Sequence, residues 1–449
     1  MDIFLILPNQ LFDKKILLEL DHKININNSI KQTCQFILWE HPHYFTKYNY
    51  NKKKLMLHRG SMKYYFDYLN KNNFKVAYFT FEKIPDINNY FLFDPIDDIK
   101  LPNKYEIIQS PNFLLSNELC EKYRNKSKKF LFNAFYMFGK KELDIMPEMK
   151  SQDKLNRSKM PENIDIPQMP SNKSDLKYIK KSAKYVNTNF NRNCGNVDRF
   201  IFPLTHNTAK KFLTYFIDFK FKHFGDYQDS INEKNQYMFH SLLSASINIG
   251  LLNPCDIIET IMPYKNKIDL NNFEGFIRQL FWREYQRYCH IYYDFNKKNF
   301  FGNVKKLNAE WYTGKLGIKP VDDCIISGFN LGYLNHINRL MVVGNYMNLS
   351  GISPKEGFKW FMEFSCDSYE WVMKQNVYEM VFFISGGDTM RKPYISSSNY
   401  ILKMSNYKRG EWCELWDKKY YDFLKKHKKL LWKFRYHFPM LNNLEKKEI

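Results

Sequence analysis

Four side chains in or just after the segment FIRQLFWREY, residues 276–285, could together form a binding surface. If the segment is helical, Gln279, Trp282, Arg283 and Gln286 are three or four residues apart and therefore share one face. An aromatic ring, an amide and a guanidinium on one face suit a planar, anionic ligand. The alternative is a structural helix with a buried tryptophan and a paired arginine, and these ten residues alone favour that alternative.

Two further segments carry groups that could act on a ligand. Residues 239–244, FHSLLS, offer hydroxyls and backbone N–H groups of the kind that hold a phosphate or diphosphate, although serine is also a common helix cap. Residues 320–323, PVDD, indicate a helix start with acids in its first turn. We expect this helix to continue through Asn335, His336 and Arg339, and a lone histidine there is more often structural than catalytic.

The charge balance favours a polyanionic partner. The chain has 449 residues, with 68 Lys and Arg against 47 Asp and Glu, a formal net charge of +21. Phosphate contacts with counterion release are one use of such a surplus. The alternative is that Lys-, Asn- and Ile-rich usage follows from an AT-rich genome, with much of the charge simply solvated.

The cysteine pattern and the hydropathy bear on metal sites, disulfides and membrane association. The eight cysteines are scattered without a CxxC pair, which argues against a zinc site, an iron–sulfur framework or a disulfide scaffold. No apolar run reaches membrane-spanning length, and no basic region precedes the first apolar run. We expect a soluble, intracellular monomer without a metal site or a membrane partner, in whichever compartment holds its polyanionic partner.

The pattern of apolar residues predicts an α/β region followed by a helical one. Short apolar runs that read as strands alternate with a helical spacing at residues 53–69, which is typical of a parallel sheet. The strand-like runs are residues 3–7, 35–40, 75–80 and 105–109. We assign an α/β domain to residues 1–125, a long linker to 126–199, a helical domain to 200–441 and a tail to 442–449.

Motifs in the C-terminal half resemble those of the photolyase/cryptochrome superfamily, most closely its prokaryotic (6-4) photolyase branch. They occur in the family's order: FGDYQDS at 224–230, FHSLLS with NIGLLNP at 239–254, EGFIRQLFWREY at 274–285, WYTG at 311–314, LNHINRLMVVGN at 334–345, YEWVMKQNVYEM at 369–380 and KPYISSSNYILKMSNY at 392–407. DKLNR at 153–157 and, more loosely, ILPNQLF at 6–12 add to the resemblance. The family implies an α/β antenna domain, a long linker and a helical domain that holds a U-shaped FAD.

The resemblance assigns residues to the flavin. Those expected to hold FAD are Ser241, Leu242, Leu243, Ser244, Arg283, Arg339, Glu370 and Asn376. Within this set Glu370 is placed to pair with Arg339, and Asn376 is expected to face flavin N5. Trp360, Tyr369 and Tyr312 match aromatic residues that relay electrons to the flavin, whereas Phe361 stands where the family usually has a tyrosine.

The resemblance also assigns residues to damaged DNA. Gln279 and Trp282 match the pair that faces a lesion flipped out of the duplex. Photolyases are among the enzymes that flip their target base. His336 matches the histidine that delivers a proton to a (6-4) lesion, with Asn335 in place of an adjacent histidine and with Tyr394 and Tyr400 as active-site tyrosines. In the linker, Lys154, Arg157 and Lys159 are candidates for phosphate contacts, although a solvated linker is the commoner explanation of such charges.

The branch has two further cofactors, an iron–sulfur cluster and an antenna chromophore, and we expect only the second in this protein. The cluster cysteines of the branch would fall at Pro320, Lys408 and Glu411, and Cys324 and Cys413 are displaced from them, so we predict no iron–sulfur cluster. A lumazine-type antenna chromophore is implied by the N-terminal half. Its candidate contacts are Asn9, Gln10 and Glu40.

The sequence thus predicts an enzyme, a light-driven FAD-dependent DNA photolyase with (6-4) photoproducts preferred. A cyclobutane dimer photolyase is the near alternative, since that reaction needs no proton from His336. A cryptochrome-like light sensor is a second alternative, against which we count the short segment 442–449. A DNA-binding module that has lost its chemistry is the third.

Overall fold

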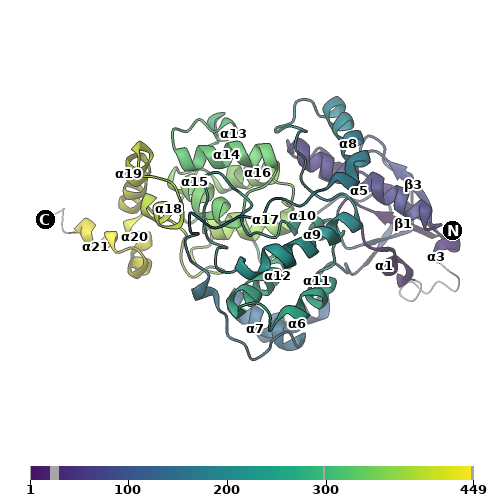
Figure 1. Cartoon of the computed structure of the whole chain (residues 1–449), viewed down its shortest axis with the longest axis horizontal. Helices are drawn as coiled ribbons and strands as arrows, with labels where there is room; N and C mark the ends of the chain where they lie inside the picture. Colours follow the sequence, from purple (N-terminus) through teal and green to yellow (C-terminus); the bar gives the residue numbers. More distant parts are fainter. Residues whose placement is uncertain (1, 21–29, 297–298, 446–449) are drawn as a thin grey trace.

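The computed structural model describes residues 2–20, 30–296 and 299–445, and it combines a parallel sheet with a larger helical part. Figure 1 shows the sheet at the N-terminal end and the last helices at the opposite end of the molecule. The strands are β1 (Asp2–Ile6), β2 (Cys34–Trp39), β3 (Lys75–Phe79), β4 (Tyr90–Phe93) and β5 (Tyr105–Ile108). Their order is β3-β2-β1-β4-β5, and all four pairings are parallel.

Four of the five strands were predicted within one residue at each end. The central strands are buried because Phe4, Leu5, Ile6, Phe36 and Leu38 are wholly covered. The sequence analysis missed β4, whose four residues YFLF are too few for period-two alternation to show. The expected α/β class with a parallel sheet is confirmed.

The helices of the first 189 residues include α5, which matches the helical spacing seen in the sequence. They are α1 (Lys14–Leu18), α3 (Ile30–Thr33), α4 (Pro42–Phe45), α5 (Lys52–Lys71), α6 (Asn117–Lys126), α7 (Phe132–Glu142) and α8 (Leu176–Asn189), with 3-10 turns η1 (Asp153–Leu155) and η2 (Lys173–Asp175). Helix α8 lies within the segment that we read as an irregular linker, and it packs along α5. That part of the connection is therefore structured.

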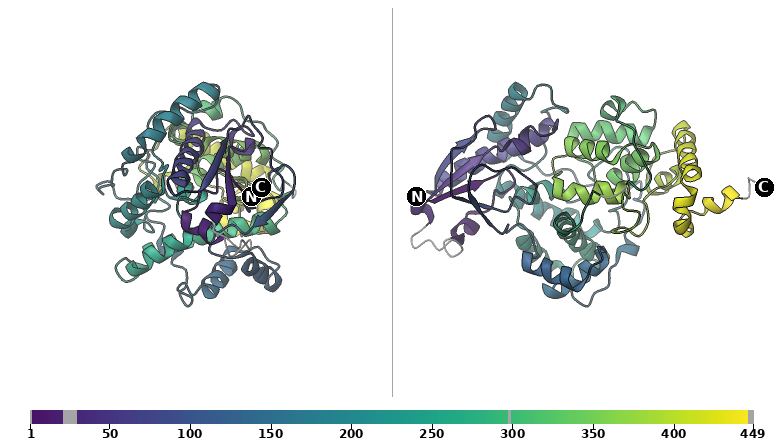
Figure 2. Two further views of the ribbon diagram at one scale, coloured as in Figure 1. Left: turned by 90° about the vertical axis from the view of Figure 1, so that its right-hand side faces the viewer. Right: turned by 180° about the vertical axis from the view of Figure 1, so that it is seen from behind.

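The rest of the chain is helical, as predicted. Its elements are α9 (His206–Phe219), η3 (Phe221–His223), α10 (Ser244–Asn248), α11 (Pro254–Ile261), η4 (Met262–Tyr264), α12 (Leu270–Tyr292), α13 (Glu310–Thr313), α14 (Lys319–Leu331), η5 (Asn338–Gly344), α15 (Asn345–Leu349), α16 (Pro354–Phe364), α17 (Glu370–Met373), η6 (Lys374–Val381), α18 (Ser398–Met404), α19 (Glu411–Lys426), α20 (Lys428–Leu431), η7 (Trp432–His437) and α21 (Met440–Glu445). Figure 2 shows from behind that α19 to α21 extend beyond the other helices.

Helix α12 is the long central helix of this region. Ile277, Leu280, Phe281 and Tyr288 are buried on one face. Helix α7 packs closely on it, since a Cβ at Gly139 would lie 2.5 Å from the Phe281 ring. A glycine is needed there for the two helices to approach. The other face of α12 is thereby held toward the interior of the helical region.

Two π-helices, η5 and η6, pack against each other beside α12. A Cβ at Gly344 would lie 2.7 Å from the Val381 side chain, so the contact requires glycine. Widened π turns often occur at functional sites. Both segments carry residues of the cavity described below.

Candidate functional site

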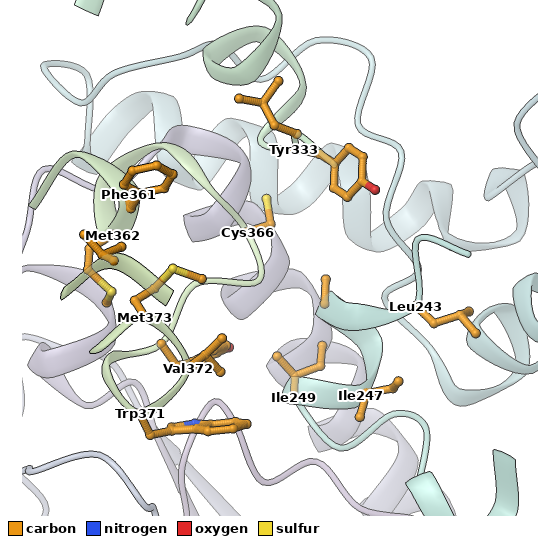
Figure 3. Packing of buried hydrophobic residues seen from close by; sticks show 14 of the residues in the cluster. Leu243, Ile247, Ile249, Tyr333, Phe361, Met362, Cys366, Trp371, Val372 and Met373 are labelled. Carbon is orange, nitrogen blue, oxygen red and sulfur yellow. The ribbon is translucent and has the colours of Figure 1, made fainter. Parts of the chain in front are cut away.

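A cavity of about 580 Å³ lies between α10, α12, the two π-helices and the segment 392–404. This volume is in the range of small-molecule and cofactor sites. Of the residues nominated from the sequence, those that line it are Arg157, Ser241, Leu242, Ser244, Gln279, Trp282, Arg283, His336, Arg339, Asn376, Tyr394 and Tyr400. Figure 3 shows part of its apolar surroundings, with Phe361, Val372 and Met373 on one side and Ile247 on the other.

One wall of the cavity is a polar network centred on Asp367. Arg339 holds both carboxylate oxygens, with Nη1 2.9 Å from Oδ1 and Nη2 3.1 Å from Oδ2. The Ser244 hydroxyl donates to Oδ2 at 2.7 Å, and Asn248 Nδ2 donates to the Asp367 backbone carbonyl at 2.9 Å. Burial favours a higher pKa for Asp367, but Arg339 and the hydrogen bonds from Ser365 and Ser244 lower it, so the carboxylate stays ionised.

The predicted pairing of Glu370 with Arg339 is wrong. Glu370 Oε1 instead lies 2.6 Å from Lys47 Nζ and accepts from the Tyr48 hydroxyl at 2.7 Å. Glu370 begins α17 and faces Lys47 and Tyr48 of the α/β region, whereas Asp367 lies in the turn before that helix. Asp367 is therefore a site residue that sequence reasoning missed.

Arg283 crosses from α12 toward this network. Its Nε donates to Asn248 Oδ1 at 2.9 Å and its Nη1 donates to the Asn112 carbonyl at 2.7 Å. Burial, together with the nearby Arg287 charge, lowers the pKa of Arg283 to about 10, with Glu284 opposing. The side chain is 91% buried, and Nη2 has no hydrogen-bond partner among the described residues.

Asn376, on η6, has an acceptor without a partner among the described residues, whereas Arg283 in the same cavity lining has a donor without one. Its Nδ2 donates to the Val372 carbonyl at 2.9 Å, while its buried Oδ1 has no partner within the described chain. Buried polar atoms without partners are uncommon in proteins. A free donor on Arg283 and a free acceptor on Asn376 fit a ligand that offers both kinds of hydrogen bond, as the ring system of a flavin does.

The segment at residues 241–244 adopts an unusual backbone. Leu242 has φ of 60°, which a branched side chain adopts rarely and usually at functional positions. Leu243 is 1% exposed and packs in the core, away from the cavity. The Ser244 hydroxyl is engaged by Asp367, which leaves the half-buried Ser241 hydroxyl as the available one.

The opposite end of the cavity carries aromatic and acid–base groups. The ring of Trp282 is stacked on that of Phe132, with centroids 3.7 Å apart and planes 5° apart. Gln279 Nε2 donates to Gln228 Oε1 at 3.2 Å. Phe132, the first residue of α7, was missed because nothing in its local sequence pairs it with α12.

His336 lines the cavity, and its side chain is exposed there. Burial, followed by the charges of Arg339 and Arg278, lowers its pKa to about 4. The expected continuation of the preceding helix through this residue is wrong, because α14 ends at Leu331 and Gly332 has φ of 66°. A new helical segment starts instead, and Asn335 caps it by accepting from the Asn338 N–H at 2.9 Å.

Asn335 is consequently 1% exposed and does not line the cavity. Its side chain is used in the cap. Its predicted place beside His336 in the catalytic group is therefore not supported by the geometry.

A charged group at the cavity mouth includes three residues that we did not nominate. Arg157 and Arg278 both bind Asp153, at 3.0 and 3.1 Å. Burial and the Asp153 charge raise the pKa of nearby Asp229 to about 6, with Arg157 and Arg278 opposing. Burial also raises the pKa of Tyr394 and Tyr400, so both phenols keep their protons. The motifs FGDYQDS and DKLNR could have drawn attention to the two aspartates.

The remaining nominated residues lie away from the cavity. Lys154 and Lys159 are exposed. Trp360 is fully buried and donates from Nε1 to the Trp311 carbonyl at 2.7 Å. Tyr369 is 1% exposed, with its hydroxyl 2.8 Å from His58 Nε2, and Tyr312 donates to Glu363 at 2.9 Å.

The candidate antenna residues are already engaged by the protein. Asn9 donates to the Pro95 carbonyl at 3.1 Å, and Gln10 donates to the Phe93 carbonyl at 2.6 Å. Glu40 is fully buried and binds Arg59 at 2.6 Å and the hydroxyls of Tyr78 and Tyr185 at 2.5 and 3.1 Å. These contacts tie the sheet to its flanking helices.

Metal-ligand clusters and membrane-spanning helices are both absent from the part of the chain that the structure describes. No group of three or more His, Cys, Asp or Glu side chains in residues 2–20, 30–296 and 299–445 could hold a metal ion. Over the same ranges, no helix has the length and apolar character needed to cross a membrane.

An α/β region joined to a helical one, with a cofactor-sized cavity in the helical part, defines the class of fold. The family model described as deoxyribodipyrimidine photo-lyase-related protein matches residues 4–98 and 85–202. The (6-4) photolyase of Agrobacterium fabrum is 38% identical over 238 residues, which are 51% of this chain. The match spans 46% of that relative, less than half its length.

Solved structures agree on the fold. A bacterial class III photolyase from Agrobacterium tumefaciens has a TM-score of 0.56 at 13% identity, over 90% of this chain and 86% of that one. A Synechocystis cryptochrome has a TM-score of 0.56 at 13% identity, over 99% and 89%. A Sulfolobus tokodaii photolyase solved with two FAD molecules has a TM-score of 0.54 at 14% identity, over 96% and 89%. The family model, the Agrobacterium fabrum relative and the solved structures all support a relationship to the photolyase/cryptochrome superfamily, near its (6-4) branch.

Proposed function

We propose that this protein is a light-driven, FAD-dependent DNA photolyase that repairs UV photoproducts, with (6-4) lesions preferred. The observation that carries the proposal is one continuous cavity. It joins groups suited to a flavin, Arg283 and Asn376, to groups suited to a flipped base, Trp282, His336 and Tyr394. The name of the Agrobacterium fabrum relative supports the lesion class.

The inner part of the cavity would hold the flavin. Arg283 offers a free N–H and Asn376 a free carbonyl oxygen, while the Arg339–Asp367 pair fixes the wall between them. Ser241 and the strained backbone at Leu242 would meet the diphosphate. A bound flavin in its reduced form, excited by light, supplies the electron that opens the lesion.

The outer part would hold the damaged base. Phe132 covers one side of Trp282, which fixes the indole and leaves the rest of its surface to the cavity. Stacking on an aromatic ring contributes about 1–3 kcal/mol per base. Gln279 on the same helix face would read the edge of the base.

His336 would deliver the proton that a (6-4) lesion needs. With its pKa lowered to about 4 it is neutral in the free protein at neutral pH, so it must first gain a proton. Phosphates and the lesion bring negative charge toward Arg339 and Arg278, the two cations that keep this pKa low. Neutralising them favours the imidazolium, and Tyr394 and Tyr400 remain available as hydrogen-bond donors.

The low pKa of His336 is also the specific reason to keep a second candidate. Cyclobutane dimer repair needs no proton transfer, and Asn335 supplies no second titratable group because it caps a helix. A dimer photolyase with the same cavity is therefore the alternative. It predicts dimer repair that is insensitive to His336→Ala.

A basic and aromatic rim at the cavity mouth would contact DNA. Arg157, Lys392 and His437 line the cavity. His437 ends η7, in which Tyr436 is 82% exposed and Trp432 is 37% exposed. Arg435 lies over both rings, with its guanidinium carbon 4.6 Å from the centroid of Tyr436 and 5.3 Å from that of Trp432. Basic side chains that alternate with aromatic rings are suited to binding a nucleic acid.

The deciding experiment compares two lesions. Oligonucleotides that carry either a (6-4) photoproduct or a cyclobutane dimer are illuminated with chemically reduced protein, and restored bases are followed by chromatography. We expect restoration of the (6-4) substrate, lost in His336→Ala while FAD remains bound. Restoration of the dimer alone would replace the proposal with its alternative, and a protein that binds no FAD would refute both.

A further inference from the structure

A second cavity, of about 560 Å³, lies at the C-terminal end of α12. It is close in volume to the cavity of about 580 Å³ described above, and the two share no lining residue. Its walls come from the end of α6 and the segment after it, from the end of α12, and from residues 387 and 388. None of the motifs that point to a flavin or to damaged DNA contributes to this second cavity. Its volume is that of a small-molecule site.

One side of the second cavity is basic, because Arg124, Lys128 and Lys129 line it. The guanidinium carbon of Arg124 lies 4.8 Å from the centroid of the Phe130 ring, and Arg124 Nη1 donates to the Lys128 backbone carbonyl at 3.1 Å. These contacts hold the guanidinium in place without neutralising it. Among the described residues, none of the three cations has a carboxylate oxygen within 4.0 Å. The positive charge on this side is therefore available to a ligand.

The other side of the second cavity carries two carboxylates, those of Asp294 and Asp388. The Tyr293 hydroxyl donates to Asp388 Oδ2 at 3.0 Å, and Tyr293 is only 7% exposed. Burial raises the pKa of Tyr293, so its hydroxyl keeps the proton and remains a donor. The Tyr293 ring lies 5.0 Å from that of Phe130, which also contacts Arg124. Buried aromatic packing thus connects the acidic side to the basic side, while no ion pair joins them within the described chain.

Tyr292 gives the second cavity an aromatic surface. It is the last residue of α12, and it lines the cavity with a half-buried side chain. Its ring packs on that of Tyr288, with centroids 5.1 Å apart. An aromatic ring that is supported on one side and partly accessible on the other offers a surface on which a base can stack.

We propose that this second cavity binds a ribonucleotide. Arg124, Lys128 and Lys129 would hold the phosphate, since guanidinium and ammonium groups are the side chains that bind phosphate most strongly. Asp388 would accept a hydrogen bond from the ribose 2′-hydroxyl, as a carboxylate does in dinucleotide sites, and Tyr292 would stack on the base. A ligand with these three parts satisfies the basic side, the acidic side and the aromatic surface together. An inorganic anion would satisfy only the first.

The two carboxylates favour a small ligand over a stretch of DNA backbone. A strand that placed several phosphates on the basic side would also bring negative charge toward Asp294 and Asp388, and like charges repel. A mononucleotide has its negative charge at one end only, and its sugar hydroxyls can face the carboxylates. The inference is independent of the proposed function, because it uses none of the residues that line the first cavity.

The test is a calorimetric titration of the protein with AMP in the dark, with saturating FAD present and its fluorescence recorded. We expect a single class of AMP site and no release of FAD. Arg124→Ala, and Lys128→Ala combined with Lys129→Ala, should each weaken AMP binding about tenfold or more, because each removes hydrogen bonds between charged groups. Lys180→Ala combined with Lys181→Ala, at two exposed lysines of α8, is the matched control and should leave the affinity unchanged.

Two further ligands test the separate parts of the site. Inorganic phosphate should bind far more weakly than AMP, because it reaches only the basic side. 2′-Deoxy-AMP should bind about tenfold more weakly than AMP, because it lacks the hydroxyl that would donate to the charged Asp388. In Asp388→Ala this preference for AMP over 2′-deoxy-AMP should disappear. A preference that survives in Asp388→Ala, or that is absent from the unaltered protein, would overturn the assignment of the ribose.

The other results that would overturn the inference are equally distinct. Release of FAD by AMP would place the nucleotide in the first cavity, and displacement of AMP by undamaged duplex would assign the basic side to DNA. Absence of saturable AMP binding, or an equal loss of affinity in the control variant, would also reject the site. Repair of lesions without AMP binding would reject this inference alone, whereas AMP binding that depends on Arg124 in a protein without repair activity would reject the proposed function alone.

Discussion

Arg339 and Asp367 form a two-point ion pair on the cavity wall, with N–O distances of 2.9 and 3.1 Å. The pair joins the π-helix η5 to the turn before α17, two segments 28 residues apart. It also fixes Ser244 and, through Asn248, Arg283. Asp367 thus aligns, through both its carboxylate and its backbone carbonyl, the polar groups that we propose for the flavin.

Replacing this carboxylate should weaken both the fold and flavin binding. Asp367→Asn leaves Arg339 without its charge partner, and breaking a buried pair costs about 3–5 kcal/mol. We expect a lower midpoint of chemical unfolding and a weaker FAD affinity by fluorescence titration. An unchanged affinity for FAD would contradict the role given to the pair.

The same pair predicts an acid limit to stability. The folded-state pKa of Asp367 lies below its ordinary 3.8, so its contribution is present above that pH and is lost as the pH falls through the lowered value. Denaturant titrations at a series of pH values should show a steeper loss below about pH 3.8 in the unaltered protein than in Asp367→Asn. Parallel curves would count against the lowered pKa.

The lowered pKa of His336 also predicts a loss of stability as the pH falls, here because a neutral imidazole, and not a carboxylate, gains a proton. Its folded-state pKa of about 4 lies below the ordinary 6.5, so unfolding takes up a proton between these values and stability falls as the pH drops from 6.5 toward 4. NMR titration of the imidazole should give the low value in free protein and a higher one with lesion DNA. A value near 6.5 in the free protein would remove the electrostatic argument.

The stacked pair Trp282 and Phe132 predicts an indirect effect on the lesion. Phe132→Ala removes the ring that fixes Trp282 and should lower affinity for a flipped base by part of the roughly 1–3 kcal/mol of stacking. Equilibrium binding of lesion and undamaged duplexes measures this. Phe300→Ala, an aromatic change outside the cavity lining, is the control. Equal losses for both duplexes would argue against a lesion-specific role.

The exposed rim predicts a general effect on DNA. Tyr436→Ala and Trp432→Ala should each weaken binding to damaged duplex, and more so together, because both rings are free for stacking beside Arg435. Tyr105→Ala, at a 41% exposed tyrosine on β5, is the matched control. If the control and the rim variants bind equally well, η7 is not a DNA-contacting surface.

A substitution of Glu40 distinguishes a structural role of its carboxylate from a role in binding an antenna chromophore. Its carboxylate is fully buried against Arg59, Tyr78 and Tyr185. Glu40→Ala should destabilise the α/β region by about 3–5 kcal/mol, measured by thermal unfolding. Loss of a bound chromophore at unchanged stability would restore the antenna interpretation instead.

Local spacing and family resemblance carried different sequence-based predictions. The face of α12 shared by Gln279, Trp282, Arg283 and Gln286 follows from three- and four-residue spacing, and all four residues line the cavity. The other segments that line the cavity were predicted from the resemblance of their motifs to those of the photolyase/cryptochrome superfamily. The apolar runs likewise gave four strands.

The errors concern contacts that depend on turns. Gly332 ends α14 and makes Asn335 a cap, which a continuous helical pattern did not reveal. The choice between Asp367 and Glu370 depends on the turn before α17, and the stack of Phe132 on Trp282 depends on how α7 meets α12. The rim at η7 could have been noticed from the run KKHKKLLWKFRYHF.

Light-dependent repair by the reduced, FAD-loaded protein tests the central claim most directly. A duplex with a single (6-4) photoproduct is mixed with excess protein, and the restored bases are counted after flashes and in a dark control. The account predicts restoration that requires light and FAD and disappears in His336→Ala. Absence of restoration for both lesion types, with FAD bound and DNA bound, would contradict it.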